Sequence, residues 1–371
     1  MLVLVANLGS TSFKFKLLDM GQNGQELARG GYERIGQAGS PYRTHGDVID
    51  VILKGLPQQP DAIGFKAVHG GPISGAVRVN DEVLSTMEQF SDVAPAHNPP
   101  YIAAMRAFRE KLPDVPQVAA FETAFHQTIP AARQVYAIPH EWTEQLGIRR
   151  YGFHGASHRY IATRVPELVG REKSRRVISC HLGGSCSVCA IQDGKSVANS
   201  FGMTAQSGVP HCNRVGDFDT FALLKLTKHG HSLEEVFKKL SKEGGMLGMS
   251  GVSPDMRDVE TAAAGGSQRA KLAIDAFVES VRHYLGAYLV ALGGCDVLAF
   301  TGGIGENGID LRAAICRGLE WAGIVLDPQK NQVRGKETKV SSVESDAEIW
   351  IVPTNEELIV ARQTEAVLTA N

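Results

Sequence analysis

The chain has 371 residues, with 38 lysines and arginines against 40 aspartates and glutamates, and 43% of its residues are hydrophobic. This balance gives no sign of a basic surface that would bind nucleic acid or an acidic membrane, and the apolar content argues against disorder. No apolar run is long enough to cross a membrane, and the opening MLVLVANLGSTS lacks the features of a signal peptide. We therefore expect two domains and a cytoplasmic protein.

A strand-turn-strand pattern occurs twice. Residues 1–20 predict strands at LVLVAN and FKFKLLDM around the turn LGSTS, and residues 176–195 predict strands at RVISCH and VCAIQDGK around LGGSCS. Superposing His181 on Asn7 aligns the two glycine turns at an offset of 174 residues, nearly half the chain. The repeat predicts two related domains that face each other, with one small loop from each at the cleft.

Helices and short strands alternate through the rest of the chain. The spacing of apolar residues predicts helices at 100–111, 157–168, 218–242, 267–293, 312–323 and 355–369, and buried strands at 296–300 and 348–352. Thr354 or Asn355 is the expected N-cap of the last helix. The alternation indicates an α/β fold throughout.

Six cysteines are present, and Cys186 and Cys189 form a CxxC pair. No second pair stands at zinc-finger spacing, and the alternating run SCSVCAIQ places the two thiols on opposite faces of a strand. We interpret the cysteines as ordinary buried thiols, with metal binding and redox chemistry as the alternatives.

The two glycine turns have the composition of phosphate-binding loops. In the first, Gly9 lets backbone amides approach an anion, and the Ser10 and Ser12 hydroxyls and the Lys14 amine can bind phosphate oxygens. The turn LGGS at 182–185 repeats this arrangement. Two such loops facing each other would hold a triphosphate between the domains.

A third glycine-rich run, TGGIGENG at 301–308, follows a predicted strand. Gly303, Gly305 and Gly308 match GxGxxG, and Asp327 lies 19 residues beyond, so a dinucleotide site is one interpretation. A loop for adenosine or phosphate is the favoured interpretation, and a purely structural turn is the third. The chain has no Walker A motif and no GxSxG elbow.

The segment RRYGFHGASHR at 149–159 concentrates three arginines and two histidines. His154 and His158 stand four residues apart, but no glutamate follows His154, so the HExxH zinc motif is absent. Arginines with an imidazole suit an anionic group in transfer. The alternative is a helix start capped by Ser157, with solvated arginines. Further polar islands are KAVHGG, HNPP, ETAFH, NRVGD, DMRD and TNEE.

At these residues the chain resembles the acetate and propionate kinase family, within the superfamily of acetate and sugar kinases, heat-shock ATPases and actin. The likeness runs nearly end to end, through NLGSTSFKF, VHGG, APAHNPP, FETAFHQTIP, RRYGFHGASHRY, CHLGGSCSVCAI, SGVSPDMRD, FTGGIGENG and VPTNEELIVAR. The resemblance implies reversible transfer of the ATP γ-phosphoryl group to a short-chain carboxylate, with Mg²⁺, in a homodimer. It also implies two ribonuclease-H-like domains with a duplicated core and an active site between them. Domain I is expected at 1–147, with the C-terminal helix 359–371 packing back on it, and domain II, which binds nucleotide, at 148–358.

The resemblance also assigns roles residue by residue. Magnesium positions are matched by Asn7 and Glu356, and catalytic positions by Glu122, His154 and Arg214. Nucleotide-binding positions are matched by Ser10, Ser12, Lys14, His181, Leu182, Gly183, Gly184, Ser185, Asp255, Met256, Arg257, Gly303, Ile304, Gly305, Glu306 and Asn307. The substrate would meet Lys66, Val68, Ala96, Phe153 and Ala205. A carboxylate is already a competent nucleophile, so positioning and charge neutralisation suffice for this chemistry.

Three departures from the family pattern bear on activity. Lys66 stands where most acetate kinases have arginine, and lysine lacks the planar bidentate fork. Glu122 stands where the family usually has aspartate, and the extra methylene displaces the carboxylate by about an ångström. The segment TAQSGVPHCNRVGD rewrites the surroundings of Arg214. A nucleotide-binding paralogue with altered or lost transfer activity is therefore the alternative function, and an NAD-dependent dehydrogenase is the third.

Two alanines predict an enlarged acyl pocket. Acetate kinases typically carry leucine and proline where this chain has Ala96 and Ala205. Each additional buried CH₂ is worth about 0.8 kcal/mol, so we expect a substrate larger than acetate, such as propionate or butyrate.

Overall fold

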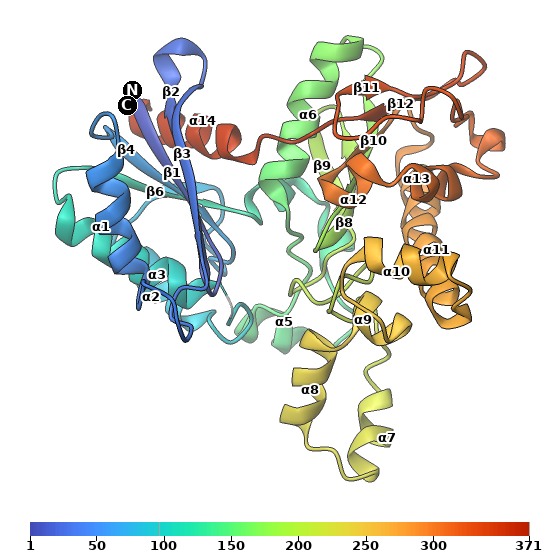
Figure 1. Ribbon diagram of the computed structural model, residues 1–371, viewed down its shortest axis with the longest axis horizontal. Coiled ribbons are helices and arrows are strands. Elements are labelled where there is room, and N and C mark those ends of the chain that lie inside the picture. Colours follow the sequence, from blue (N-terminus) through green and yellow to red (C-terminus); the bar gives the residue numbers. More distant parts are fainter. Residues whose placement is uncertain (96, 371) are drawn as a thin grey trace.

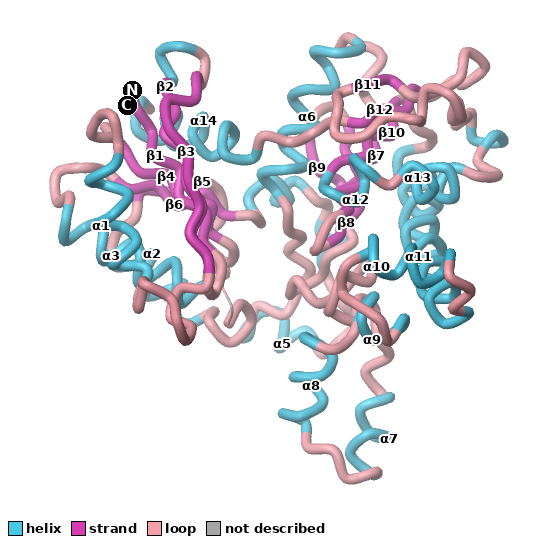
Figure 2. Tube along the Cα trace, viewed as in Figure 1, coloured by secondary structure: helices cyan, strands magenta, loops and turns pink. Residues whose placement is uncertain are grey.

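Two six-stranded mixed sheets form the framework of the protein (Figures 1 and 2). The computed structural model describes residues 1–95 and 97–370. The first sheet has the order β3-β2-β1-β4-β6-β5, formed by β1 (Leu2–Leu8), β2 (Ser12–Asp19), β3 (Gln25–Glu33), β4 (Ala62–Ala67), β5 (Ala76–Arg78) and β6 (Gln117–Phe121). The second has the order β11-β12-β10-β7-β8-β9, formed by β7 (Arg176–Leu182), β8 (Cys186–Gln192), β9 (Lys195–Asn199), β10 (Val297–Thr301), β11 (Thr338–Lys339) and β12 (Glu348–Ile351).

The two sheets share one topology, which confirms the predicted duplication. In the first, β1 pairs antiparallel with β2 and parallel with β4, and β4 pairs parallel with β6. In the second, β7 pairs in the same way with β8 and β10, and β10 with β12. The 174-residue offset superposes β1 on β7 from end to end. The second glycine turn is one residue shorter, because Leu8 pairs with Phe13 whereas Leu182 pairs with Cys186.

Helices cover both faces of the first sheet. We call this sheet and its helices the first lobe. Leu4, Ala6 and Leu8 of β1 pack against α1 (His45–Gly55), α2 (Asp81–Gln89) and α3 (Asn98–Lys111). Val3 and Val5, on the opposite face, pack against the C-terminal helix α14 (Glu356–Thr369). Burial on both faces explains why this strand is an apolar run without alternation. The expected packing of the last helix on the first half is therefore observed, and Asn355 is its N-cap.

The second sheet is covered in the same way and forms the second lobe. Ile178, Cys180 and Leu182 of β7 pack in a core with α10 (Met256–Ala264), α11 (Gln268–Leu292) and α13 (Ile309–Cys316). Val177 packs in a smaller core with α6 (Gly155–Val169). The short helix η2 (Ala124–Thr128) already packs against β9. The domain boundary between residues 147 and 148 stays a prediction.

The remaining helices are short and lie mainly in the second half. They are η1 (Met20–Gln22), α4 (Ala131–Gln134), α5 (His140–Leu146), α7 (Ala222–Lys228), α8 (Leu233–Lys242), α9 (Gly245–Ser250), α12 (Gly302–Asn307) and η3 (Glu320–Ala322). The single helix predicted at 218–242 is two helices, because Gly230 adopts a positive φ of 90° between them. The helix predicted at 312–323 starts earlier and ends at Cys316, before Gly318 at a φ of 71°.

Five of the six cysteines are buried, as the sequence predicted, whereas Cys212 is only half-buried. Cys186 and Cys189 lie on opposite faces of β8, each in a different hydrophobic core. Burial raises the pKa of both thiols to about 12, so neither is a ready nucleophile or metal ligand. Within residues 1–95 and 97–370, no helix is long and apolar enough to span a membrane.

Candidate active site

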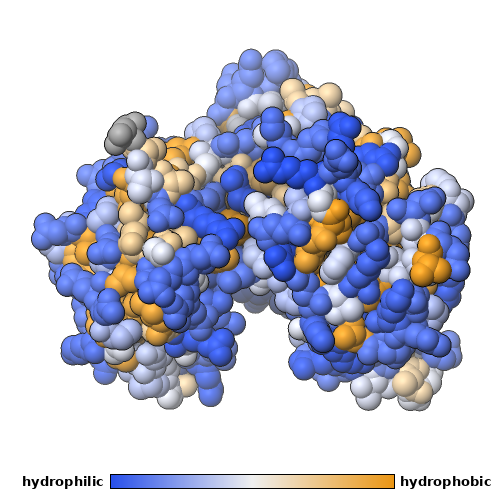
Figure 3. All heavy atoms as spheres, turned by 90° about the horizontal axis from the view of Figure 1, so that it is seen from above, coloured by the Kyte–Doolittle hydropathy of each residue, from blue (hydrophilic) through white to orange (hydrophobic). Residues whose placement is uncertain are grey.

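The carboxyl ends of the parallel strands carry most of the predicted chemistry. In the first lobe, Asn7 lies near the end of β1, Lys66 near the end of β4, and Glu122 directly after β6. In the second lobe, His181 lies near the end of β7 and the glycine run follows β10, and beyond β12 the chain reaches Glu356 at the start of α14. Open α/β sheets bind ligands outside these strand ends. The space-filling view shows a deep notch between the two lobes (Figure 3).

A buried ion-pair group lies where the two lobes meet. Lys66 Nζ lies 3.5 Å from Glu122 Oε1 and also contacts Glu356 Oε2. Burial disfavours the ammonium, but the Glu356 and Glu122 carboxylates outweigh it and raise the pKa of Lys66 well above its ordinary value. Burial raises the pKa of Glu122 to about 6 despite the neighbouring lysine. At Glu356 burial acts upward too, but the lysine charge prevails and the pKa is lowered.

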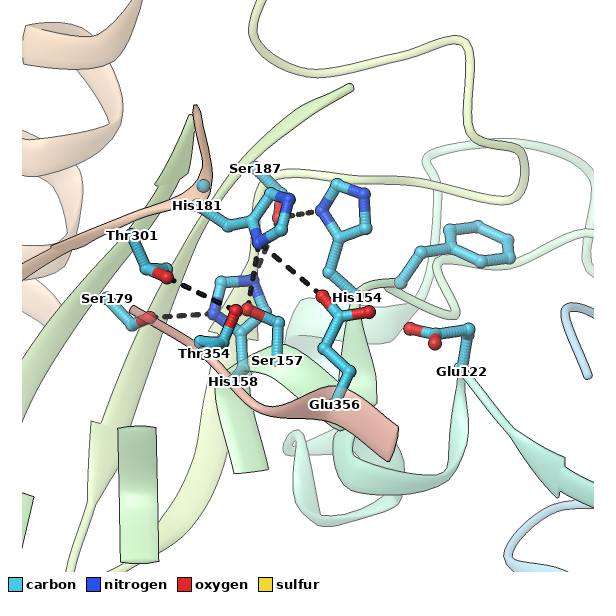
Figure 4. A network of polar contacts seen from close by, with 12 residues as sticks. Glu122, His154, Ser157, His158, Ser179, His181, Ser187, Thr301, Thr354 and Glu356 are labelled. Atoms are coloured by element: carbon cyan, nitrogen blue, oxygen red, sulfur yellow. Dashed lines mark hydrogen bonds and ion pairs between the residues drawn. The ribbon is translucent and has the colours of Figure 1, made fainter. Parts of the chain in front are cut away.

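His154 is held at the start of α6 by a left-handed backbone with a φ of 58°. The next residue, Gly155, donates its N–H to the carbonyl of Glu122 at 2.9 Å. The side chains of His154 and Glu122 therefore project from neighbouring segments of backbone. His154 Nδ1 is hydrogen-bonded to Ser187 Oγ at 2.8 Å, and its ring centroid lies 4.1 Å from that of His181 (Figure 4). Burial, and then the imidazoles and cations around it, lower the pKa of His154 well below its ordinary value, so the ring is neutral.

The alternative interpretation of Ser157 as the N-cap of this helix is wrong. The helix begins at Gly155 with His154 as its N-cap, because the left-handed turn starts the helical backbone two residues earlier. Ser157 instead forms a hydrogen bond of 2.8 Å with His181 Nδ1. It therefore orients a side chain of the site.

Arg214 and His97 approach from opposite lobes. Arg214 Nη1 donates to the carbonyl of Ala205 at 2.6 Å, which ties the rewritten segment to itself across nine residues. Burial lowers the pKa of Arg214. His97, the N-cap of α3, is affected by burial first and then by the charges of Arg214 and Lys66, and its pKa falls to about 4. The charges of Arg214 and Lys66 therefore both act at this point of the cleft.

The predicted acyl-contact residues are only partly brought together. Phe153 is buried with its ring centroid 5.5 Å from Phe201 and 5.7 Å from His69, the residue after Val68. Ala205 lies beside Arg214 through the carbonyl contact. Ala96 lies outside the described residues.

A cavity of about 810 Å³ lies in the second lobe, and Gly183 in its wall is next to His181. It is lined by Gly183, Gly184, Cys212, Pro254, Asp255, Met256, Arg257, Glu260, Gly303, Ile304, Asn307, Gly308, Leu311 and Arg334. Eight of these lining residues were predicted to bind nucleotide. The volume suits a small ligand bound between glycine loops and apolar walls.

The other predicted nucleotide residues do not line this cavity. Leu182 and Gly305 are buried beneath it, and the Glu306 carboxylate accepts from Gly302 N at 3.0 Å within its own helix. His181 lies behind Gly183, between the cavity and His154. Neither it nor Ser185 is among the lining residues, and Ser10, Ser12 and Lys14 belong to the hairpin of the first lobe.

Local structure explains the shape of the cavity. The run predicted as a glycine loop is the six-residue helix α12, entered through Gly302 at a φ of 76°. A Cβ at Gly302 would lie 2.6 Å from the carbonyl oxygen of Leu182, so the tight passage between β10 and β7 requires glycine. Asp255 caps α10 and accepts from Arg257 Nε at 2.9 Å, and these hydrogen bonds lower the pKa of Asp255 to about 2.

The residues present fit a magnesium ion held jointly with phosphates. Mg²⁺ prefers oxygen ligands and usually keeps only one or two from the protein. Asn7, near the end of β1, and Glu356, at the start of α14, carry such oxygens. Both Glu122 oxygens are buried without a hydrogen-bond partner among residues 1–95 and 97–370, although Oε1 forms an ion pair with Lys66. Across the same ranges no cluster of three metal-ligating side chains occurs.

Sequence reasoning missed several residues of the site. His158, Ser179 and Ser187 lie behind His154, and Glu260 and Arg334 complete the cavity. The two serines had a recognisable signal, since each is a polar residue inside a strand that is otherwise buried and apolar. Glu260 and Arg334 had none, because solvent-facing charges on helices and loops are ordinary.

Comparison with known proteins agrees with this geometry. The model of the acetokinase family matches residues 47–362, most of the chain. The chain belongs to the acetokinase family. It is therefore a phosphotransferase with a carboxyl group as acceptor, and the dehydrogenase interpretation of the glycine run is wrong.

Relatives and solved structures of this family cover the chain from end to end. Acetate kinases of Dictyoglomus thermophilum and Clostridium botulinum are 44% and 42% identical, each over 99% of both chains. The crystal structure of Porphyromonas gingivalis acetate kinase is 37% identical with a TM-score of 0.91 over 99% of this chain and all of that one. A propionate kinase from Francisella tularensis is 35% identical with a TM-score of 0.91 over 99% of both. The duplicated two-domain fold expected from the resemblance is thereby confirmed.

Proposed function

We propose that this acetokinase-family member transfers the γ-phosphoryl group of ATP, with Mg²⁺, to a short-chain carboxylate larger than acetate, and that it does so reversibly. The observation that carries the proposal is the convergence of Lys66, His154 and Arg214 on one cleft beside the cavity of about 810 Å³. A glycine-lined cavity next to fixed cations suits a nucleotide whose terminal phosphate reaches the cations.

The reaction needs little more than placement and charge. A carboxylate oxygen of the acid attacks the γ-phosphorus, the bond to the β-phosphate bridging oxygen breaks, and ADP leaves. Arg214 and the neutral His154 stabilise charge on the transferring group, and Lys66 places the carboxylate. Asn7 and Glu356 would hold magnesium together with the phosphates, and the bound ion would neutralise charge on the nucleotide.

Substrate size follows from Ala205. Its side chain replaces a larger one typical of acetate kinases, and Phe153, another residue expected to contact the acyl group, is held between the rings of His69 and Phe201. A fixed aromatic wall cannot move in to fill the space that a smaller residue leaves. Propionate and butyrate are therefore the proposed substrates, and a Francisella tularensis protein of the same fold is a propionate kinase.

A homodimer is proposed through the hairpin of α7 and α8, which projects from the second lobe (Figure 1). Its large exposed apolar side chains are Phe221, Leu224, Leu233 and Phe237. Helix α8 is acidic in its first half, at Glu234 and Glu235, and basic in its second, at Lys238 and Lys239. Two copies packed antiparallel about a twofold axis would match acid to base. F237D should yield a monomer by light scattering, and an unchanged mass would refute this surface.

The activity is tested by trapping the acyl phosphate as its hydroxamate, with Mg-ATP and acids from formate to valerate. A signal that peaks at three or four carbons is expected. A maximum at acetate would refute the enlarged pocket but keep the kinase. Silence across the series, with ATP still binding, would favour the alternative of a nucleotide-binding paralogue, which Lys66 and Glu122 also motivate.

A further inference from the structure

Four side chains form a continuous chain of hydrogen bonds behind the cleft (Figure 4). Ser179 Oγ lies 2.9 Å from His158 Nδ1, His158 Nε2 lies 2.8 Å from Ser187 Oγ, and Ser187 Oγ lies 2.8 Å from His154 Nδ1. Ser179, His158 and Ser187 are fully buried, whereas His154 is only half-buried. His154 Nε2 makes no hydrogen bond within the described part of the chain, and its ring places that atom on the side away from Ser187 (Figure 4).

The direction of each hydrogen bond depends on where the protons lie. A neutral imidazole has one N–H and one acceptor nitrogen, and each hydroxyl has one proton to donate and can accept two hydrogen bonds. If His154 Nδ1 is the donor, either Ser187 accepts from both imidazoles and its own buried proton has no acceptor within residues 1–95 and 97–370, or Ser187 donates to His158 and His158 donates to Ser179. The proton of Ser179 then has no acceptor, since its hydroxyl has no other hydrogen bond within residues 1–95 and 97–370.

In the opposite direction every buried donor is satisfied. Ser179 donates to His158 Nδ1, His158 Nε2–H donates to Ser187, and Ser187 donates to His154 Nδ1. The single donor without a partner is then His154 Nε2–H, which belongs to the one half-buried side chain of the four. A buried donor without a partner is costly enough to favour this direction by about fivefold to a hundredfold.

We propose that Ser179, His158 and Ser187 are positioning residues that fix His154 in its Nε2–H tautomer, so that it donates a hydrogen bond to the transferring phosphoryl group. The identity of the acceptor rests on the proposed function. The tautomer of His154 rests only on the buried hydrogen bonds. The three residues touch neither substrate, and act only through His154.

Two features of the surroundings support a neutral donor. Burial, and then neighbouring imidazoles, lower the pKa values of His154 and His158 well below the ordinary value, so neither ring gains a second proton near neutral pH. Lys66 and Arg214 add positive charge around His154. A second imidazolium is not needed there, and a neutral N–H supplies direction without further charge.

The chain also contains a matched control. His126 Nδ1 lies 2.8 Å from Ser196 Oγ, the same kind of buried hydroxyl–imidazole pair. Its Nε2 lies 2.8 Å from the carbonyl oxygen of Phe153. That oxygen can only accept a hydrogen bond, so it fixes His126 in the Nε2–H tautomer without help from the serine. Ser196→Ala therefore removes an equivalent hydrogen bond without freeing His154.

The test combines ¹⁵N-histidine NMR of the ligand-free protein with steady-state kinetics. In the wild type, the His154 signals, assigned by their loss in His154→Gln, should show a protonated Nε2 and an unprotonated Nδ1. Ser187→Ala should give mixed tautomers and lower kcat by about tenfold to a hundredfold, with each KM changed less than about twofold. Ser196→Ala should change neither the His154 signals nor kcat.

A pair of substitutions at His158 keeps the proposal falsifiable. In His158→Gln the amide N–H₂ replaces the donor to Ser187 and should keep the His154 tautomer and most of kcat, whereas His158→Met should behave as Ser187→Ala does. Should the methionine variant fail to fold, Ser187→Ala still decides. An Nδ1–H tautomer in the wild type, or an unchanged tautomer in Ser187→Ala, would overturn the proposal even if the enzyme is an active kinase. An inactive wild type would refute the proposed function, but the NMR measurement would still test whether His154 is in the Nε2–H tautomer.

Discussion

Lys66 Nζ lies 3.5 Å from the Glu122 carboxylate, and the same ammonium also contacts Glu356. Glu122 follows β6 of the first lobe, whereas Glu356 begins the helix that returns from the second. One lysine thus occupies the centre of a buried group of charges where the two lobes meet.

Replacing Lys66 should destabilise the protein markedly. Lys66→Met leaves two buried carboxylates without their cation, and breaking a buried pair typically costs about 3–5 kcal/mol. Urea unfolding measures this loss. Lys16→Met is the matched control, because Lys16 pairs with Glu26 and Glu357 near the surface and should lose about 1 kcal/mol or less. Equal losses in the two variants would show that the buried group contributes nothing special.

Filling the acyl pocket should restore a preference for acetate. Ala205→Val adds two methyl groups, and at about 0.8 kcal/mol per CH₂ the butyrate-to-acetate ratio of kcat/KM should fall roughly tenfold. The hydroxamate series measures the ratio. Ala264→Val, at an exposed position of α10, should leave it unchanged. A ratio that is the same in both variants would contradict a wall at Ala205.

Two adjacent glycines of α12 should respond differently to substitution. A Cβ at Gly303 meets nothing within 4 Å and projects from a residue that lines the cavity. Gly303→Val should therefore fold normally and raise the KM for ATP at least about tenfold, with the KM of the acid unchanged. Gly302→Ala meets the Leu182 backbone at positive φ and should lose stability by about 1–3 kcal/mol. A stable Gly302→Ala with ordinary ATP affinity would contradict this account.

Acid should weaken the fold through its buried histidines. Burial lowers the pKa of His126 to about 4 from 6.5, so between these values the unfolded chain binds more protons than the folded one. The free energy of unfolding should therefore fall as the pH drops from 6.5 to 4, by up to about 3 kcal/mol for this residue. Urea unfolding at several pH values should show a shallower slope in His126→Asn, and the wild-type slope in His140→Asn, whose side chain is 77% exposed. Identical slopes in all three proteins would refute the assignment.

Much of the framework was predictable from local patterns. The repeated strand-turn-strand units could be aligned because each buries an apolar run and turns at glycine, and the same offset relates β1 to β7 in the structure. The opposite faces of Cys186 and Cys189 followed from the twofold periodicity of a strand. Eight residues that line the cavity are among the nucleotide-binding positions that the family resemblance implied, and their binding of nucleotide stays a prediction.

The rest depends on contacts between distant segments or on backbone conformation. The left-handed φ of His154 is uncommon for a residue other than glycine, so the pattern favoured a helix start at Ser157 instead. The bonds from Ser179 and Ser187 to His158 join β7, β8 and α6, and no spacing within one segment reveals them. Arg334 reaches the cavity from a loop that follows η3, far along the chain from Gly183.

The first strand, β1, and the last helix, α14, both lie on the first lobe, because α14 returns there from the second sheet (Figure 1). The chain thus passes between the two sheets twice, once after β6 and once between β12 and α14. Glu122 and Glu356 stand close to these two connections, with Lys66 in contact with both. A movement of one lobe against the other would therefore turn close to this charged group, which would keep its three side chains together.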